Sequence, residues 1–254
     1  MIPEYGDVNV LELKELPDPE PGPDQAIVEL AAAGVNYMDV YARIGTNNPT
    51  LPLIPGGEGS GIVIKIGKDV TEVSVGDRVA YTGAGMSYAE RVCVPSWRLV
   101  KVPDDMDIEM GAAAMLQGMT AHYLAHTTYP LKAGDIALVH SGAGGVGLLL
   151  IQMAKMAGAQ VISTVSTKEK SLIAKTAGAD HTILNSEQSV ADEVMKITND
   201  QGVQVVYDAV GKDTFDGSVA SLAPRGYLVS YGAASGPVPP VPMAVLNPKS
   251  LFLT

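Results

Sequence analysis

The spacing of apolar residues changes after about residue 100 of this 254-residue chain. Before that point, short apolar runs such as 25–35 (QAIVELAAAGV) and 58–67 (EGSGIVIKIG) alternate with glycine- and proline-rich stretches. This pattern is typical of short β-strands joined by turns. It predicts a compact β-rich domain, with a short helix over 36–45 (NYMDVYARIG) that Gly45 ends.

The second part of the chain alternates between two periodicities. Residues 106–129 predict a long helix, interrupted near Gly118. Buried strands are then predicted at 136–140, 160–165, 181–184, 203–207 and 227–231, with helical stretches between them and a sixth strand at 250–254. Alternating strands and helices indicate a parallel, doubly wound sheet, so the fold class is α/β. We place the domain boundary in the long helix.

A glycine-rich stretch, HSGAGGVG at 140–147, joins the first of these strands to a helix that Gly158 ends. Gly142, Gly144 and Gly147 fit the pattern G-x-G-x-x-G. A strand, this turn and a helix together are typical of a dinucleotide site, where backbone N–H groups at the helix N-terminus hold a pyrophosphate. A plain tight turn is the alternative, because the glycine pattern by itself is weak.

The end of the next strand bears on the choice between NAD and NADP. An NAD site carries an acidic residue there, about 20 residues past the first glycine, that binds the ribose 2′-hydroxyl. In this chain Glu169 comes later, on the following helix. The residues at and after the strand end carry hydroxyl or amino groups instead: Ser163, Thr164, Ser166, Thr167, Lys168 and Lys170. Hydroxyls and ammonium groups suit a 2′-phosphate, so NADPH is the predicted cofactor.

Composition excludes several other classes. A net charge of −11 argues against a nucleic-acid-binding surface and against attraction to anionic membranes. No apolar run has the length of a membrane span, and the N-terminus shows no leader pattern. A single cysteine, Cys93, permits neither an internal disulfide nor a cysteine zinc cluster, so we expect a reducing, cytoplasmic setting.

Seven stretches occur in an order that resembles a known family: GVNYMDVYARIG, IPGGEGSGIV, VGDRVAY, LQGMTAHYL, HSGAGGVGLLLIQMAK, VVYDAVGKDTF and PRGYLVSYGAASG. Together they resemble the zinc-free quinone oxidoreductases of the medium-chain dehydrogenase/reductase superfamily. The resemblance implies a GroES-like domain over 1–117, a Rossmann domain over 118–254 and an active site in the cleft between them. Asn36 and Gly57 stand where the zinc-dependent members carry a cysteine and a histidine, so no metal is expected.

The resemblance also implies roles for individual residues. Those expected to bind NADPH are Ala143, Gly144, Gly145 and Val146 at the pyrophosphate, Ser166 and Lys170 at the 2′-phosphate, Asn36, Tyr41, Gln117 and Thr120 at the nicotinamide, and Tyr231, Gly232 and Ala233 beside the cofactor. Asn36, Tyr41 and Thr120 are the catalytic candidates. Tyr41 would donate a hydrogen bond to a quinone oxygen, although a packed aromatic side chain is the alternative.

Some positions depart from the family pattern. Asn185 stands where relatives carry a tyrosine near the adenosine phosphate, and it is still expected to bind the cofactor there because its amide can donate a hydrogen bond. Asn47 replaces a second tyrosine of the cleft. The chain begins a few residues late and stops at Thr254, so the C-terminal return segment is expected to be absent. Relatives often pair through the last sheet strand, which makes a homodimer a further expectation.

Three functions stay open on the sequence. NADPH-dependent reduction of a quinone or a related electron-poor carbonyl is the first. Reduction of the C=C bond of an α,β-unsaturated carbonyl, with the same cofactor, is the second. Binding of NADPH without turnover is the third.

Overall fold

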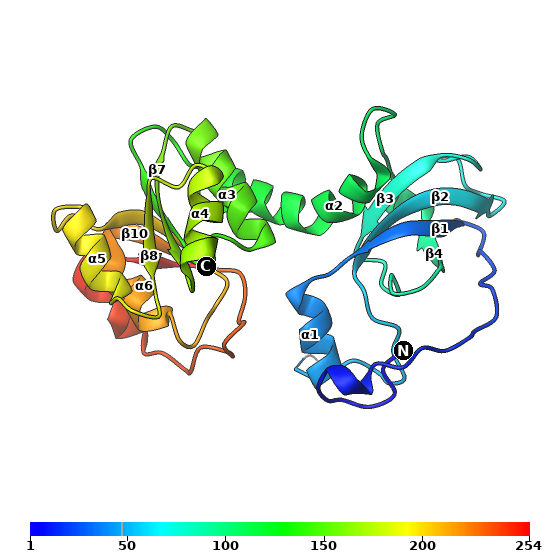
Figure 1. Ribbon diagram of the computed structural model, residues 1–254, viewed down its shortest axis with the longest axis horizontal. Helices are drawn as coiled ribbons and strands as arrows, with labels where there is room; N and C mark the ends of the chain where they lie inside the picture. Colours follow the sequence, from blue (N-terminus) through cyan, green and yellow to red (C-terminus); the bar gives the residue numbers. More distant parts are fainter. Residues whose placement is uncertain (47) are drawn as a thin grey trace. The chain divides into compact units, whose positions relative to one another are not determined.

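The computed structural model describes residues 1–46 and 48–254, so the expectation for Asn47 lies outside the described residues. The chain forms two compact units, Met1–Leu116 and Gln117–Thr254. Figure 1 shows both, and each is described by itself below.

The first unit is built on an antiparallel sheet in the order β4-β1-β2-β3-β5. Its strands are β1 (Gln25–Gly34), β2 (Glu58–Ile66), β3 (Arg78–Thr82), β4 (Arg91–Pro95) and β5 (Val100–Lys101). Buried β-branched side chains, Val28, Val63, Val79 and Val94 among them, form the core together with Tyr81. Such residues favour strands because they pack well on a pleated surface.

The helix α1 (Tyr37–Ile44) follows β1 in this unit. Asn36 precedes its first turn, and the Asp39 carboxylate accepts a hydrogen bond from the Asn36 backbone N–H at 2.9 Å. Gly45 ends the helix in a left-handed conformation, φ +82°, which a glycine adopts without strain. The helix therefore starts and stops at the residues that the sequence indicates.

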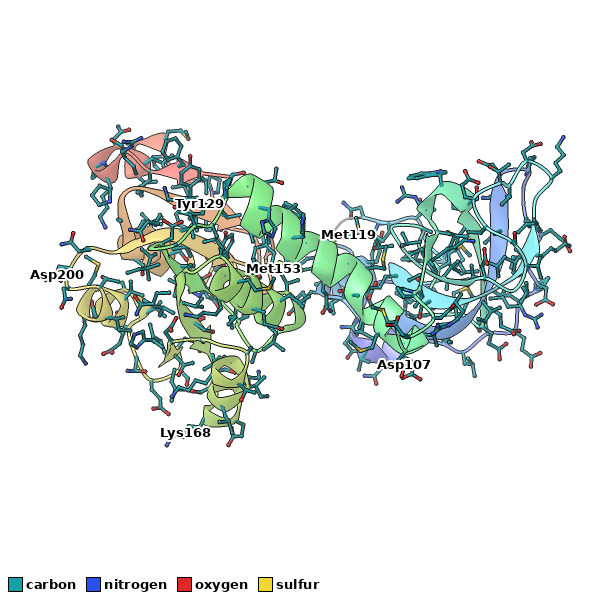
Figure 2. The ribbon with its side chains drawn as sticks, turned by 90° about the horizontal axis from the view of Figure 1, so that it is seen from above. Asp107, Met119, Tyr129, Met153, Lys168 and Asp200 are labelled. Carbon is teal, nitrogen blue, oxygen red and sulfur yellow. The ribbon has the colours of Figure 1, made fainter. Side chains whose placement is uncertain are left out.

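The long helix α2 (Ile108–Tyr123) differs from the prediction, because it continues through Gly118. One glycine costs a helix only about 1 kcal/mol, which the neighbouring helix-forming residues overcome. The irregular part comes later, as a π-helical turn at Leu124–Thr128. Figure 2 labels Asp107 just before α2, Met119 within it and Tyr129 after the π turn. The Tyr207 hydroxyl lies 3.3 Å from both the Leu124 and the Tyr129 carbonyl oxygens and donates a hydrogen bond to this turn.

The second unit contains a six-stranded parallel sheet in the order β11-β10-β9-β6-β7-β8. Its strands are β6 (Ile136–Val139), β7 (Gln160–Val165), β8 (His181–Leu184), β9 (Val203–Asp208), β10 (Leu222–Ser230) and β11 (Phe252–Leu253). The strand β10 begins earlier than predicted, and its pairing with β9 is irregular between Leu222 and Tyr227, where Arg225 is left-handed at φ +62°. The order reverses between β6 and β9, the position where sheets of this kind bind dinucleotides.

Helices cover both faces of this sheet. They are α3 (Gly145–Met156), α4 (Lys168–Thr176), α5 (Val190–Ile197) and α6 (Phe215–Ser221), with a 3₁₀ segment at Met243–Lys249. Ala137 and Val139 of β6 pack with residues of α3 and α4 on one face, whereas Leu138 packs with residues of α5 and α6 on the other. Figure 1 shows α3 and α4 on one side of the sheet and α5 and α6 on the other. This two-faced core confirms the predicted α/β, doubly wound architecture. No helix among the described residues is long and apolar enough to cross a membrane.

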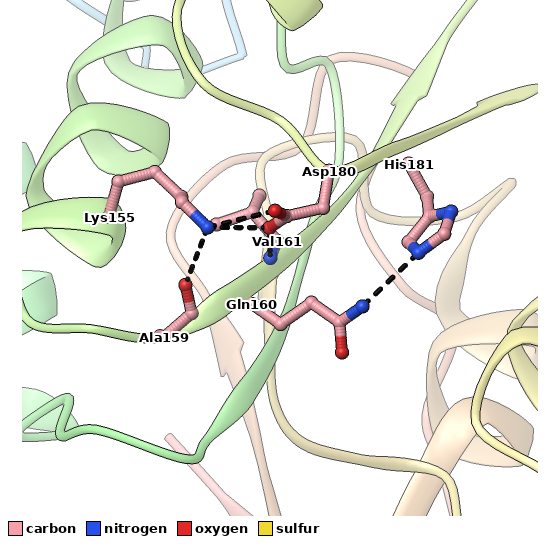
Figure 3. Close-up of polar contacts among 6 residues, drawn as sticks. All are labelled: Lys155, Ala159, Gln160, Val161, Asp180 and His181. Atoms are coloured by element: carbon pink, nitrogen blue, oxygen red, sulfur yellow. Dashed lines mark hydrogen bonds and ion pairs between the residues drawn. The ribbon is translucent and has the colours of Figure 1, made fainter.

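An ion pair between Lys155 and Asp180 lies at the amino-terminal end of β7 (Figure 3). The glycine-rich turn lies at the opposite, carboxyl end of the sheet strands. Lys155 Nζ lies 2.9 and 2.8 Å from the two carboxylate oxygens of Asp180 and donates to the Ala159 carbonyl at 3.1 Å. Asp180 also accepts from Val161 N at 2.7 Å. Burial opposes ionisation of Asp180, but the hydrogen bonds from Lys155 and Val161 outweigh it, and the pKa of Asp180 is lowered.

Candidate dinucleotide site and acceptor residues

The glycine-rich turn lies at the carboxyl end of β6 and leads directly into α3. Gly144 is the N-cap of α3, and its backbone is extended, with φ −81° and ψ 166°. A Cβ atom on Gly147 would lie 2.5 Å from the Ser141 carbonyl oxygen and 2.8 Å from Gly142 Cα, so only a glycine lets the helix pack this closely on the turn. A Cβ on Gly144 would meet only the Ser141 carbonyl, at 3.1 Å, and so intrudes mainly on the space above the turn.

This turn fits an anionic group. The N-cap residue of α3 is Gly144, so no N-cap side chain competes for the N–H groups of the first turn. Four of the predicted cofactor residues, Ala143, Gly144, Gly145 and Val146, lie in this one segment. The side chain of Gln117 lies against Gly145, where it would overlap any added Cβ. The glycines therefore leave the backbone at this strand-to-helix turn uncovered by side chains of its own, as close approach of a pyrophosphate requires.

Hydroxyl and amino groups gather at the carboxyl ends of β7 and β8. Lys170 Nζ donates to Ser166 Oγ at 3.1 Å, and the Ser186 hydroxyl donates to the Ser166 carbonyl at 3.3 Å. Asn185 follows β8 and donates its backbone N–H to the Val165 carbonyl at 3.1 Å. The structure thus brings together three predicted residues, Ser166, Lys170 and Asn185. Sequence analysis missed Ser186, which the hydroxyl-rich stretch after β8 would have indicated.

A third segment of the same sheet edge follows β10. Tyr231 N donates to the Asp208 carbonyl at 2.9 Å, and Ala234 N donates to the Ala209 carbonyl at 3.1 Å. A Cβ on Gly232 would lie 2.7 Å from the Ala209 carbonyl oxygen. Tyr231, Gly232 and Ala233 therefore run beside the loop that follows β9, on the edge that also carries the glycine-rich turn.

A buried chain of hydrogen bonds links three of these strand ends, and sequence analysis missed it. Ser141 N donates to Thr164 Oγ1 at 3.3 Å, and Thr164 Oγ1 lies 3.0 Å from His140 Nδ1. On the other side, His140 Nε2 lies 3.0 Å from Ser218 Oγ, which donates to Asp208 at 2.7 Å. Burial lowers the pKa of His140, and the neutral imidazole accepts at Nδ1 and donates at Nε2. The chain holds the start of the glycine-rich turn against the ends of β7 and β9.

In the first unit, Asn36 is buried beside a carboxylate. Asn36 Nδ2 donates to Glu58 Oε1 at 2.6 Å, and the Leu116 N–H donates to Glu58 Oε2 at 2.6 Å. Burial raises the pKa of Glu58, although both hydrogen bonds oppose the shift. Sequence analysis assigned no role to this glutamate; the GGEGSG stretch was the signal available for it.

The other acceptor-side candidates lie on two helices. Tyr41 lies on α1, one turn from Tyr37, with ring centroids 5.3 Å apart in an edge-to-face arrangement. Nearby, the Tyr88 hydroxyl donates to Asp39 at 3.1 Å, and burial, with that carboxylate, raises the pKa of Tyr88 to about 12. Thr120 lies on α2, three residues after Gln117, so the two side chains share one face of that helix.

The fold and the turn define a class of protein: a GroES-like unit joined to a dinucleotide-binding unit. Residues 22–104 match the family described as "Alcohol dehydrogenase GroES-like domain". Residues 145–254 match the family described as "Zinc-binding dehydrogenase". Both matches agree with the two units of the fold.

Individual relatives narrow the class. A quinone oxidoreductase of Pseudomonas aeruginosa is 46% identical over 253 residues, which are 98% of this chain and 78% of the relative. A 2-haloacrylate reductase of a Burkholderia species is 42% identical, over 87% of this chain and 68% of that protein. The crystal structure of Escherichia coli quinone oxidoreductase complexed with NADPH superimposes with a TM-score of 0.96 at 37% identity, covering 99% of this chain and 78% of that one. The chain belongs to the quinone oxidoreductase family of the medium-chain dehydrogenases/reductases, which confirms the resemblance seen in the sequence.

The second family description names zinc, but the described residues show no set of side chains suited to hold a zinc ion. No group of three His, Cys, Asp or Glu side chains comes together within the described part of the chain. Each oxygen of Glu58 accepts a hydrogen bond from an N–H group. His122 and His126 pack ring against ring, with centroids 4.5 Å apart, and the Cys93 thiol, whose pKa burial raises, donates to Gln25 at 3.1 Å.

Proposed function

We propose that this chain reduces quinones with NADPH and uses no zinc. The observation that carries the proposal is the end of β7, where Ser166 and Lys170 are joined by a hydrogen bond and no carboxylate stands at the strand end. A carboxylate would repel a 2′-phosphate, whereas an ammonium and a hydroxyl bind one. The NADPH-bound Escherichia coli relative supports the same choice of cofactor.

NADPH, when bound, supplies the hydride. The backbone N–H groups of Ala143, Gly144, Gly145 and Val146 would bind its pyrophosphate, aided by the positive end of the α3 dipole. Ser166, Lys170 and Asn185 would bind the 2′-phosphate. Tyr231, Gly232 and Ala233 would flank the cofactor along the same sheet edge.

The protein's contribution at the acceptor is hydrogen bonding and position. Asn36, Tyr41 and Thr120 are the proposed catalytic residues, and Gln117 is proposed to line the nicotinamide with them. An amide or hydroxyl donor aimed at the quinone oxygen stabilises the negative charge that develops there as the ring is reduced. The quinone oxidoreductases among the relatives, at 38–46% identity for the three bacterial ones, support a quinone as the acceptor.

The decisive experiment titrates the purified chain with NADPH and with NADH and then follows NADPH oxidation on adding 1,4-benzoquinone. We expect tighter binding of NADPH, quinone-dependent turnover, and no loss of turnover after treatment with 1,10-phenanthroline. Loss of turnover with the chelator, restored by Zn²⁺, would contradict the zinc-free part. Binding without turnover on any acceptor would favour an NADPH-binding protein that is not an enzyme.

A second reaction has one specific observation in its favour. The relative named as a 2-haloacrylate reductase is 42% identical to this chain. Reduction of the C=C bond of an α,β-unsaturated carbonyl uses the same cofactor position. Comparing kcat/KM for 2-chloroacrylate and for 1,4-benzoquinone decides between the two acceptors.

Assembly and location stay proposals. The strand β11 lies at the edge of the six-stranded sheet, where it could pair with the β11 strand of a second copy of the chain. Size-exclusion chromatography with light scattering tests this homodimer. The proposed setting is cytoplasmic, because the one cysteine of the chain forms no disulfide within it.

A further inference from the structure

Glu58 is a carboxylate buried without a cation. It begins β2, its exposed fraction is 0%, and none of the ion pairs among the described residues includes it. Its two oxygens accept from Asn36 Nδ2 and from Leu116 N, each at 2.6 Å. Desolvating a carboxylate for two neutral donors stabilises a fold little, so stability does not account for this residue.

The fold makes room for this carboxylate. Gly34 of β1 pairs with Glu58 across the sheet, and a Cβ on Gly34 would overlap the Glu58 side chain. Gly34 is not in a left-handed conformation, so its backbone does not require glycine. The absence of a side chain at Gly34 therefore leaves the space that the Glu58 carboxylate occupies.

The two donors belong to segments that both carry proposed acceptor-side residues. Asn36 is itself one of them. Leu116 lies inside α2, directly before Gln117 and four residues before Thr120. Within the first unit, Glu58 therefore joins the segment that carries Asn36 to the segment that ends at Leu116.

We infer that Glu58 is a positioning residue that orients the Asn36 amide for reduction of the acceptor. This inference rests on the proposed function, because the role of Asn36 is part of it. With Nδ2 facing Glu58, rotating the amide by 180° would place Oδ1 against the carboxylate, and repulsion forbids that orientation. Glu58→Gln removes this discrimination, because one amide of glutamine offers one good acceptor to two donors.

The test is a double-mutant cycle on turnover. Glu58→Gln should lower kcat with 1,4-benzoquinone by about tenfold or more, since a small misplacement of a catalytic group has a large effect on rate. The Kd for NADPH should stay within about threefold, because Glu58 does not touch the phosphate-binding residues. Adding Glu58→Gln to Asn36→Ala should then lower kcat by less than about twofold further. Asp77→Asn, a carboxylate of the same unit that binds Ser74 N and Lys101, is the matched control and should leave kcat unchanged.

A second measurement does not need turnover. The side-chain NH₂ signal of Asn36 in an ¹⁵N spectrum, assigned by its loss in Asn36→Ala, should move in Glu58→Gln and in Gly34→Ala, and should not move in Asp77→Asn. If the wild-type chain reduces no quinone, the proposed function fails while this spectrum still decides whether Glu58 orients Asn36. An unmoved signal, additive effects on kcat, or equal losses in kcat and in NADPH affinity would overturn the inference.

Discussion

Lys170→Ala is the change that separates the two nicotinamide cofactors most directly. Lys170 is exposed at the first turn of α4, and its ammonium donates to Ser166 Oγ at 3.1 Å. A 2′-phosphate bound there would accept from both groups, whereas the 2′-hydroxyl of NADH offers no charge to Lys170. The variant should therefore weaken NADPH binding and leave NADH binding almost unchanged.

The size of the effect follows from the exposure of the lysine. A hydrogen bond to a charged group contributes about 1.5–3 kcal/mol, and solvent screening at an exposed site brings this toward about 1–2 kcal/mol. That range corresponds to a rise of about 5–30-fold in the Kd for NADPH. Raising the salt from about 0.05 to 0.5 M should shrink the difference, because the Debye length falls well below 10 Å.

The assay is a fluorescence titration of both cofactors, with Lys168→Ala as the matched control. Lys168 lies two residues away, is exposed and, as Figure 2 shows, extends outward at the start of α4. Its loss should change neither Kd by more than about twofold, since one screened charge contributes little. Equal weakening of NADPH and NADH by Lys170→Ala, or the same selectivity loss in Lys168→Ala, would refute the placement of the 2′-phosphate.

Four further outcomes follow from the structure of the second unit. Gly144→Ala should abolish binding of both cofactors with little change in Tm, whereas Gly147→Ala should lower Tm, because its Cβ would collide with the turn itself. Asp180→Asn should lower Tm by about 2–4 °C, the shift expected for about 1 kcal/mol lost with the Lys155 contact. His140 has a lowered pKa, so the unfolded chain binds more protons, and the free energy of unfolding should fall as pH drops below about 6.5.

Calorimetry and equilibrium unfolding check these outcomes. The lowered pKa of Asp180 means that its contribution is present above the ordinary carboxyl value of 3.8 and is lost at lower pH, so wild type and Asp180→Asn should converge there. A constant difference down to pH 2 would contradict this account. The His140→Gln variant should show a weaker pH dependence of the free energy of unfolding between about pH 5 and 6.5 than the wild type. An unchanged slope would mean that another group causes this pH dependence. Tight NADPH binding by Gly144→Ala would show that the pyrophosphate lies elsewhere.

Much of the second unit was predictable because its information is local. The alternation of apolar runs located all six parallel strands, and HSGAGGVG located the turn between β6 and α3. The lack of a carboxylate after β7 is likewise a property of a few adjacent residues. Two predictions of element boundaries, made from the preferences of single residues, were wrong. The helix α2 continues through Gly118, where an interruption was predicted, and β10 begins at Leu222, earlier than the predicted residue 227. In both, neighbouring contacts outweigh the preference of single residues.

By itself, the sequence determined the β-rich first part, the alternation of strands and helices that follows it, the glycine-rich turn and the polar character of the β7 end. Only the tertiary structure decided that Glu58 lies between Asn36 and Leu116, 22 and 58 residues away along the chain. It also decided that His140 contacts both Thr164 and Ser218, which lie 24 and 78 residues after it in the chain. Periodicity reports which face of an element is buried, but a hydrogen bond between distant segments depends on strand order and register. Those arise only when the whole sheet forms, because each pairing is stable only in the presence of its neighbours.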